Sequence, residues 1–350
     1  MKLLVSALEH SANIHLHALK KELSPDVEFI GIFDKKLGSP IIDLSSLAIM
    51  GFVDAVKKLK FFFKLNAQMV ELARDADKIL LMDSSGFNLP LAKKIKKRYP
   101  EKEIIYYILP QAWAWKQKRI PVLEKTITHL ASILPFEKDY YSKNAPITYV
   151  GHPLLDEIKG FKETLSNTNK IAFMPGSRRG EIKKLMPIFT ELREKLDCEA
   201  YIIVPKQFTK EDIKEVYGTL TKFKIVHDAH QTLRECDFAF ICSGTATLEA
   251  ALIGIPFILS YIAKPLDYFL ASRLVKLDYI GLGNIMFEKF KGEALHPEFI
   301  QEEVTVENLL EAYKKFDRET FLNNSKELRK YLDHGSSKTV ASIIEGKNED

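Results

Sequence analysis

Residues 171–181 read IAFMPGSRRGE, a short apolar run followed by a glycine turn and the expected start of a helix. Gly176 permits an unusual backbone angle and lets a ligand approach the backbone closely. The N-terminus of the next helix presents free N–H groups with a partial positive charge, and Arg178 adds a planar fork that suits phosphate oxygens. The stretch therefore predicts an α/β domain in which Gly176, Ser177 and Arg178 bind an anion. The alternative is a plain turn with solvated arginines.

A second turn of this kind follows the apolar run 238–242 and reads SGTATLEAA over residues 243–251. Small residues at a strand-to-helix junction let a diphosphate rest on backbone amides and hydroxyls. Glu249 lies about one turn into the helix, where a carboxylate can accept hydrogen bonds from ribose hydroxyls. The alternative is a Ser/Thr N-cap on a core helix. The residues predicted to bind the diphosphate-containing ligand here are Ser243, Gly244, Thr245, Ala246, Thr247 and Glu249.

Neither turn is a dinucleotide or triphosphate fingerprint. No G-x-G-x-x-G follows the first apolar run, and no G-x-x-x-x-G-K-[ST] occurs in the chain. A nicotinamide-dependent dehydrogenase and a P-loop kinase are therefore disfavoured. A nucleotide diphosphate bound without a P-loop is what a nucleotide-sugar donor requires.

Short apolar runs alternate with longer amphipathic segments along the whole chain, which is typical of parallel sheets covered by helices. The polar stretch 162–170 indicates a boundary between an N-terminal domain over 1–165 and a C-terminal domain over 166–350. Two doubly wound, Rossmann-type domains of this kind are expected to face each other across a cleft at their strand ends. The helical tail after about residue 304 is expected to pack back on the first domain or against a second subunit. The expected strands are 3–7, 27–33, 78–82, 104–109, 130–134, 147–150, 171–174, 199–204, 224–227, 238–242 and 257–261. The expected helices are 10–22, 65–75, 88–98, 179–195, 209–217, 245–253 and 266–276.

Composition excludes several other classes of protein. The 51 basic and 47 acidic residues give a net charge of +4, with no long Lys/Arg block that would indicate nucleic acid as a partner. The three cysteines form no C-x-x-C pair and the nine histidines form no H-E-x-x-H, so we expect no metal and no cofactor. No apolar stretch reaches the roughly 18–20 residues of a membrane-spanning helix, so any membrane contact would be peripheral.

Residues 52–65 combine aromatic and basic side chains at helical spacing. Such a helix can lie in a lipid headgroup layer, whereas a core helix with a solvated lysine face is the alternative. A second aromatic–basic cluster occupies residues 113–119, where core packing of a tryptophan is equally consistent with the pattern. The residues predicted to face acceptor or membrane are Phe52, Val56, Lys57, Leu59, Lys60, Phe61, Phe62, Phe63, Trp113, Trp115 and Lys116.

The order of these motifs resembles that of the lipid-A-disaccharide synthase family, glycosyltransferases of the two-Rossmann-domain GT-B fold. The resemblance extends from about residue 3 to about residue 331. Its most specific segments are YILPQAWAWK (107–116), ILPFE (133–137), VGHPLLD (150–156), residues 174–181 and 243–251, GLGNIM (281–286) and PEFIQEE (297–303).

The resemblance implies a reaction in lipid A and lipopolysaccharide biosynthesis. A UDP-2,3-diacylglucosamine donor and a 2,3-diacylglucosamine 1-phosphate acceptor would give a β-1,6-linked disaccharide phosphate and UDP, with inversion and without a metal. The resemblance further implies a peripheral position on the cytoplasmic face of the inner membrane, and a homodimer is one expectation for the assembly. On the donor side it points to Asn284, Gln301 and Glu302.

Two motifs depart from the family pattern. Residues 8–13 read LEHSAN where members usually have a GExSGD-like run, and residues 83–88 read DSSGFN where members usually have DxPDFN. Gly86 therefore replaces the aspartate that is often proposed as the general base. Inversion still needs a base for the acceptor hydroxyl. Asp83 and Glu9 remain the two candidates, and His152 is expected to be structural.

Two alternatives use the same motifs. A UDP-GlcNAc 2-epimerase-like enzyme of the same fold would share the diphosphate turns but would need no lipid surface. A non-catalytic nucleotide-sugar or lipid-binding protein would explain the loss of an aspartate at Gly86.

Overall fold

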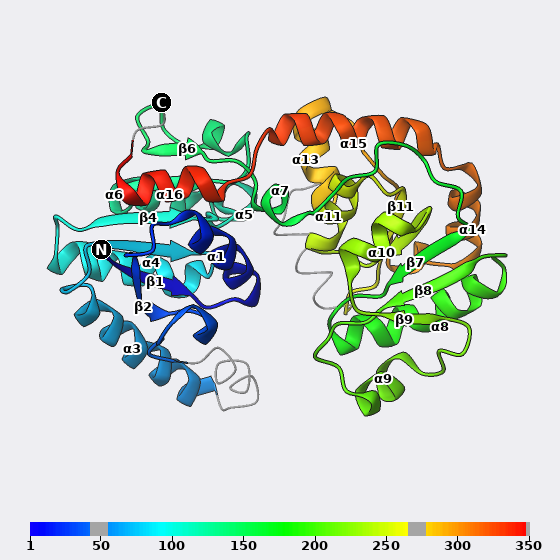
Figure 1. The fold of residues 1–350 in the computed structure, drawn as a ribbon, viewed down its shortest axis with the longest axis horizontal. Helices are drawn as coiled ribbons and strands as arrows, with labels where there is room; N and C mark the ends of the chain where they lie inside the picture. Colours follow the sequence, from blue (N-terminus) through cyan, green and yellow to red (C-terminus); the bar gives the residue numbers. More distant parts are fainter. Residues whose placement is uncertain (43–54, 265–277, 348–350) are drawn as a thin grey trace. The chain divides into compact units, whose positions relative to one another are not determined.

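The computed structural model describes residues 1–42, 55–264 and 278–347. The chain forms two compact units (Figure 1). The first comprises Met1–Glu157 and Leu332–Asp350, and the second comprises Ile158–Tyr331. In the described residues each unit contains one six-stranded sheet whose neighbouring strands are all parallel.

The first sheet has the strand order β2-β1-β3-β4-β5-β6. The chain moves from β1 to β2 in one direction and then crosses back to β3 on the other side of β1, so the order reverses between β1 and β3. The strands are β1 (Lys2–Ala7), β2 (Glu28–Ile32), β3 (Lys78–Met82), β4 (Glu103–Tyr107), β5 (His129–Ser132) and β6 (Ile147–Tyr149).

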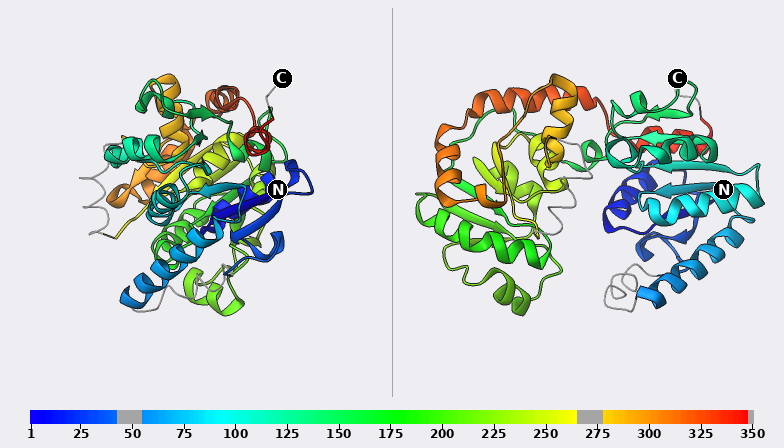
Figure 2. Two further views of the ribbon diagram at one scale, coloured as in Figure 1. Left: turned by 90° about the vertical axis from the view of Figure 1, so that its left-hand side faces the viewer. Right: turned by 180° about the vertical axis from the view of Figure 1, so that it is seen from behind.

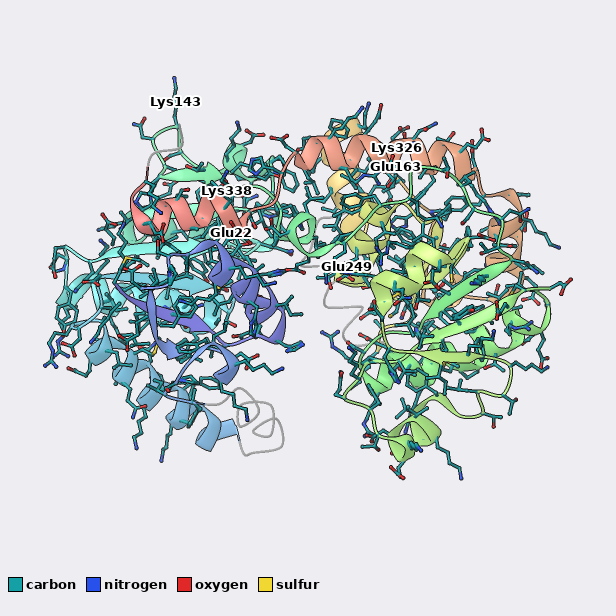
Figure 3. The ribbon with its side chains drawn as sticks, viewed as in Figure 1. Glu22, Lys143, Glu163, Glu249, Lys326 and Lys338 are labelled. Atoms are coloured by element: carbon teal, nitrogen blue, oxygen red, sulfur yellow. The ribbon has the colours of Figure 1, made fainter. Side chains whose placement is uncertain are left out.

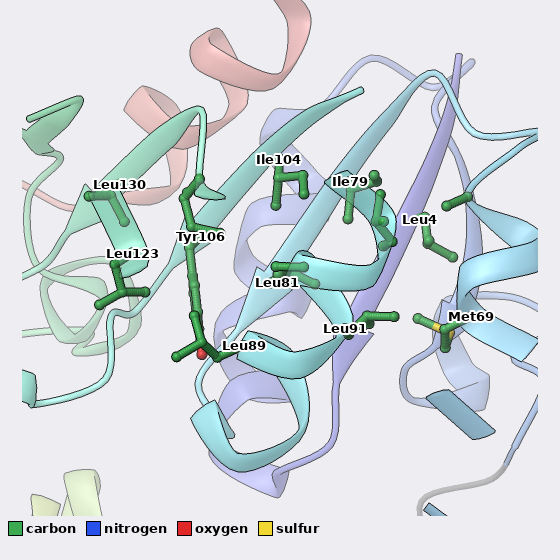
Figure 4. Packing of buried hydrophobic residues seen from close by; sticks show 14 of the residues in the cluster. Leu4, Met69, Ile79, Leu81, Leu89, Leu91, Ile104, Tyr106, Leu123 and Leu130 are labelled. Carbon is green, nitrogen blue, oxygen red and sulfur yellow. The ribbon is translucent and has the colours of Figure 1, made fainter. Parts of the chain in front are cut away.

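Both faces of this sheet are covered, which explains why its strands read as continuous apolar runs. Side chains alternate between faces along a strand, so Leu80 packs toward α1 (His10–Glu22) and α16 (Ser337–Glu345), whereas Leu81 packs toward α3 (Ala55–Leu72), α4 (Ser85–Arg98) and α6 (Ile120–Thr126). Figure 4 shows the second of these layers. Leu81 and Ile79 are on β3, and Tyr106 is on the neighbouring strand β4. Leu81 is fully buried, so truncation to alanine would cost about 2–5 kcal/mol.

The second sheet has the order β12-β11-β10-β7-β8-β9 and reverses between β7 and β10. On one face the rings of Phe173 and Phe240 stack at 5.4 Å beneath α8 (Arg179–Glu194), α9 (Lys210–Tyr217) and α14 (Val306–Lys315). Elsewhere α10 (Ala229–Glu235) packs on β7 and β8, and α11 (Thr245–Ile253) packs between α10 and α13 (Leu282–Lys291). The strands are β7 (Lys170–Met174), β8 (Glu199–Ile203), β9 (Lys224–Val226), β10 (Phe238–Ile241), β11 (Phe257–Tyr261) and β12 (Glu298–Ile300).

The predicted doubly wound α/β architecture is confirmed. The predicted helix 10–22 matches α1 residue for residue, and each predicted strand has a counterpart. Sequence reasoning missed β12, whose three residues lie in a segment too short to show alternation. The predicted helix over 266–276 lies outside the described residues.

The chain passes from the first unit to the second between Glu157 and Ile158, upstream of the predicted boundary at 165/166. The polar stretch 162–170 is part of the second unit because its polar groups are bonded there. Lys162 is buried and donates to the carbonyl oxygens of Arg234 and Cys236 at 2.9 and 2.8 Å. Asp237 accepts from the backbone N–H groups of Thr168 and Asn169, each at 2.7 Å.

The last part of the chain returns to the first unit. In Figures 1 and 2 α16, in red, lies next to α1, in dark blue, and the two helices are in contact. Asp156 holds the returning segment, because its Oδ2 accepts from the backbone N–H groups of Ser336 and Ser337, each at 2.9 Å. A Cβ on Gly335 would collide with the Asp156 carboxylate. The VGHPLLD motif thus binds the chain's own C-terminal segment through Asp156.

Candidate functional site

The candidate residues of each unit follow the strands that flank its reversal of strand order. In the first unit Glu9 follows β1 and Asp83 follows β3. In the second unit Gly176 follows β7 and Gly244 follows β10. Ligands of doubly wound sheets bind outside the carboxyl ends of the strands at this switch point. Both groups of residues therefore lie where such sheets bind ligands.

Asp83 occupies a strained backbone position. Asp83 and Ser84 have φ values of 48° and 38°, in the left-handed region that non-glycine residues rarely adopt. Each such residue costs about 1–3 kcal/mol, so the conformation persists only where neighbouring groups fix it. Here the Tyr106 hydroxyl donates to the Asp83 carbonyl oxygen at 2.5 Å, and Asn88 Nδ2 donates to the same oxygen at 3.0 Å. Strain that is maintained by neighbouring groups is typical of functional sites.

The Asp83 carboxyl group lies in a setting that favours proton uptake. Burial raises the pKa of Asp83 above its usual range, the hydrogen bond from the Ser84 N–H partly opposes this shift, and the nearby charge of Glu9 adds to it. Ser84 also joins the two candidates, since its hydroxyl donates to Glu9 Oε1 at 3.1 Å. Glu9 itself is exposed. A partly buried carboxylate with a raised pKa is suited to act as a base.

Asp83 opens into a cavity of about 210 Å³. The cations Lys116 and Arg119 also line the cavity, and Arg119 donates to Ser85 Oγ at 2.7 Å. Desolvation lowers the pKa of Lys116, and the charge of Arg119 lowers it further. Sequence reasoning had not included Ser85 or Arg119 among the site residues, although Arg119 belongs to the aromatic–basic cluster 113–119. The cavity is lined by Asp83, Ser85, Pro110, Gln111, Ala112, Lys116 and Arg119.

Trp113 belongs to the core, so its predicted contact with acceptor or membrane is wrong. Its side chain is 4% exposed, and its ring meets that of Phe136 edge to face at a centroid distance of 5.0 Å. Burial of a large aromatic surface outweighs the amphipathic character that had suggested an interfacial position. The side chain of Trp115 lies outside the described residues.

The aromatic segment on α3 divides into two parts. Leu59 and Phe63 are 59% and 61% exposed, and Lys60 and Lys64 beside them are exposed as well. Phe61 and Phe62 instead pack half-buried against the core beside α4, which corrects the prediction that they face acceptor or membrane. Phe52 and the side chains of Val56 and Lys57 lie outside the described residues.

The turn after β7 is built for close backbone approach. Gly176 has φ 106°, and a Cβ there would lie 2.9 Å from Glu181 Oε2 and 3.3 Å from Cys242 Sγ. Ser177 and Arg178 are exposed, and Arg178 NH1 donates to Glu181 Oε1 at 2.9 Å. In the described part of the chain no side chain caps the N-terminus of α8, so its first backbone N–H groups have no side-chain cap as acceptor.

The turn after β10 repeats this arrangement. Gly244, with φ 127°, is the N-cap residue of α11, and among the described residues no side chain caps this helix either. The alternative of a Ser/Thr N-cap is therefore not observed. Thr247 Oγ donates to the Gly244 carbonyl oxygen at 2.8 Å and fixes the turn, while Ser243, Thr245 and Ala246 remain at least partly exposed.

Glu249 lies on α11 and is labelled in Figure 3. Its Oε2 lies 3.3 Å from Nε2 of His230, a residue of α10 that sequence reasoning did not include. The pair links two helices that both begin at the carboxyl edge of the sheet, α10 and α11.

Three further donor-side predictions have different surroundings. Asn284 is fully buried, and its Nδ2 donates to the His296 carbonyl oxygen and to Glu298 Oε1, both at 2.8 Å. Its amide is thus used within the protein, and any effect on a donor would act through the segment it fixes. Gln301 has φ 57° and its Oε1 accepts from the Ala263 N–H at 2.6 Å. Glu302 is exposed.

Glu298 anchors this region and was missed by sequence reasoning. Its two oxygens accept from the N–H groups of Ile280 and Gly281 at 2.8 and 3.0 Å. Burial raises the pKa of Glu298 against these hydrogen bonds.

The described residues contain neither a metal-binding cluster nor a membrane-spanning helix. No group of three or more His, Cys, Asp and Glu side chains in that part of the chain is arranged to hold a metal ion. No described helix has both the length and the apolar character that crossing a membrane requires.

Comparison with solved structures identifies the fold. MurG from Acinetobacter baumannii is 14% identical and has a TM-score of 0.54 over 99% of each chain. The UDP-GlcNAc 2-epimerase from Methanocaldococcus jannaschii, solved in complex with UDP-GlcNAc and UDP, is 14% identical and has a TM-score of 0.54 over 99% of this chain and 100% of that one. At this identity the likeness concerns the fold alone, which is the GT-B arrangement of two α/β units.

Sequence comparison identifies the family. The family model described as lipid-A-disaccharide synthetase matches residues 3–347. A lipid-A-disaccharide synthase from Helicobacter pylori is 50% identical over 97% of each chain. The chain therefore belongs to the lipid-A-disaccharide synthase family of glycosyltransferases.

Proposed function

We propose that the chain transfers 2,3-diacylglucosamine from UDP to carbon 6 of 2,3-diacylglucosamine 1-phosphate, with inversion at the anomeric carbon. The products are the β-1,6-linked disaccharide 1-phosphate and UDP. The observation that carries this proposal is the strained, partly buried Asp83 at the switch point of the first sheet. It lines a cavity together with the cationic side chains of Lys116 and Arg119.

In the proposed step the acceptor hydroxyl oxygen forms a bond to the anomeric carbon while its proton passes to the Asp83 carboxylate. The bond between the anomeric carbon and the diphosphate oxygen breaks, and its electron pair leaves with UDP. The raised pKa of Asp83 makes its carboxylate a better proton acceptor. Burial is the main cause of this raised pKa, and Glu9, which accepts from the Ser84 hydroxyl, adds to it through its charge.

The second unit would bind the donor through backbone groups. The uncapped N-termini of α8 and α11 present N–H donors to the diphosphate, and Arg178 adds a mobile cation that stabilises the departing negative charge. Glu249, paired with His230, would accept from the ribose hydroxyls. In this arrangement no metal ion is required.

The acylated substrates would reach the enzyme at a membrane surface, on the cytoplasmic face of the inner membrane. The exposed side chains of Leu59 and Phe63 on α3 would enter the headgroup layer, and Lys60 and Lys64 would bind anionic lipid. This contact is peripheral.

The test is an assay with UDP-2,3-diacylglucosamine and 2,3-diacylglucosamine 1-phosphate in detergent micelles containing EDTA. Mass spectrometry should detect UDP and the disaccharide, each dependent on the acceptor. Isomerised UDP-sugar without disaccharide would instead identify an epimerase. A protein that binds UDP and yields neither product would be a non-catalytic binding protein.

A further inference from the structure

The cavity beside Asp83 is lined by charged groups of both signs. Asp83 is the one carboxylate among the described residues that line it, and Lys116 and Arg119 are its two cations. Arg119 comes from the turn Gln117–Arg119 and is held in place by its hydrogen bond to Ser85 Oγ. A group that takes up a proton and a pair of cations thus share one small space.

A third source of positive potential reaches the same cavity. Ser85 is the first residue of α4, a helix of 14 residues, and no side chain in the described part of the chain caps its N-terminus. The partial positive charge of that helix end therefore adds to the two cations. At about 210 Å³ the cavity has room for several water molecules at ~30 Å³ each, and so for a phosphate group.

We infer that Lys116, Arg119 and the N-terminus of α4 form a binding site for a phosphate monoester carried by the acceptor sugar. This inference rests on the proposed function, in which Asp83 takes the proton of the acceptor hydroxyl. A phosphate monoester carries about −1.5 to −2 charges near neutral pH, which matches two cations. Arg119 binds it with a planar fork, whereas Lys116 acts as a point charge.

The site gives the enzyme a means of selecting among hydroxyl groups. With its phosphate held by the cations, the sugar can present to Asp83 only a hydroxyl at a suitable distance and direction from that phosphate, which in the proposed reaction is the hydroxyl on carbon 6. Sugars that lack the phosphate lose this orientation, so they bind more weakly and react in several orientations. Lys116 and Arg119 are thus specificity-determining residues for the acceptor, and they take no part in proton transfer.

Steady-state kinetics with two acceptors tests the site. The first acceptor is 2,3-diacylglucosamine 1-phosphate and the second is the matching methyl glycoside, which lacks the phosphate. We expect Arg119→Gln and Lys116→Gln each to raise the KM for the phosphorylated acceptor about tenfold or more. The KM for the methyl glycoside and for the donor should change less than about twofold, because neither contacts the cations.

Two control variants separate charge from structure. Arg119→Lys keeps the charge and should recover part of the affinity for the phosphorylated acceptor. If Arg119 acted only by fixing Ser85 through its hydrogen bond, its substitution would impair the use of both acceptors equally. Lys118→Gln removes an exposed neighbouring cation that does not line the cavity and should match the wild type. Equal losses for both acceptors, or no loss for either, would overturn the inference.

A failure of the proposed function is distinguishable from a failure of this inference. If the wild type forms no disaccharide, the proposed reaction is wrong, and the site is then tested by isothermal titration calorimetry of the phosphorylated acceptor in the same micelles. Weaker binding to Arg119→Gln, together with competition by inorganic phosphate only in the wild type, supports the phosphate site. Equal binding to both proteins overturns it.

Discussion

The carboxyl edges of the two sheets lie at equivalent places in the topology but are built from different groups. In the first sheet, the turn after β3, beside the reversal of strand order, places Asp83 and Ser84 at positive φ. In the second sheet, the turns after β7 and β10, which flank the reversal, use Gly176 and Gly244 instead. The turn after β3 accepts backbone strain in order to place side chains, whereas the turns after β7 and β10 use glycine and leave the N–H groups of the following helices uncapped. The contrast suits proton transfer in one unit and anion binding in the other.

The largest effect is expected from removing the carboxylate of the first edge. Asp83→Asn should lower kcat by about 10²–10⁴-fold with little change in donor KM, because a base acts in the transition state. Glu9→Gln should have a smaller effect, since Glu9 acts through Ser84. In the wild type kcat/KM should fall on acidification as Asp83 is protonated, at a pH above the ~3.9 of an ordinary aspartate. If Glu9→Gln lowers kcat more than Asp83→Asn does, Glu9 is the base and Asp83 is not.

A backbone change should break the second edge. Gly176→Ala introduces a side chain at φ 106° within 2.9 Å of Glu181 Oε2, so we expect a loss of stability of about 1–3 kcal/mol and a weaker affinity for UDP. The measurements are chemical unfolding and calorimetric titration with UDP.

Gly218→Ala is the matched control for this experiment. Gly218, with φ 73°, is the C-cap residue of α9, and an added Cβ there would meet nothing within 4 Å. This substitution should also cost about 1–3 kcal/mol of stability, because it places a side chain at positive φ, and it should leave UDP binding unchanged. Equal UDP affinity in all three proteins would remove the turn after β7 from the donor site.

The returning C-terminal segment gives the first unit a dependence that the second lacks. Asp156→Ala removes the acceptor for three hydrogen bonds from Ser336 and Ser337, so the first unit should lose about 2 kcal/mol of stability. Urea unfolding of the full chain measures this loss, and the exposed Asp139 of the same unit provides a control through Asp139→Ala. Equal stability of the two variants would show that the hydrogen bonds to Asp156 do not stabilise the docking of α16.

The smallest effect concerns one buried histidine in each unit. Burial lowers the pKa of His152 and of His296 to about 3. An unfolded histidine titrates near ~6.5, so between these values the unfolded chain binds more protons and stability is lost as the pH falls from ~6.5 toward ~3. His152→Asn and His296→Asn should each reduce the difference in unfolding free energy between pH 7 and pH 5. An unchanged difference in either variant would mean that the histidine is already solvated in that unit.

Much of the fold was predictable because its signals are local. The runs that became β1, β3 and β10 are mainly apolar since both faces of each strand are buried, and α1 is bounded by its own periodicity. The two glycine turns were identified because a strand, a glycine and a helix start follow one another within a few residues. What was not predictable is how the motif side chains are used. Trp113 and Phe62 carry the composition of an interfacial cluster, and neighbouring elements decide that they pack inward.

By itself the sequence determined two doubly wound units, their glycine turns and the membership of a glycosyltransferase family. The tertiary structure alone decided that Asp156 accepts from the segment at Ser336, that the Asn284 amide is bonded to the backbone near His296, and that Arg119 donates to Ser85 in the lining of the Asp83 cavity. The physical reason is the range of the interactions. Propensity and periodicity report what neighbours in the chain require. A hydrogen bond between residues 180 positions apart exists only once the sheets have brought them together.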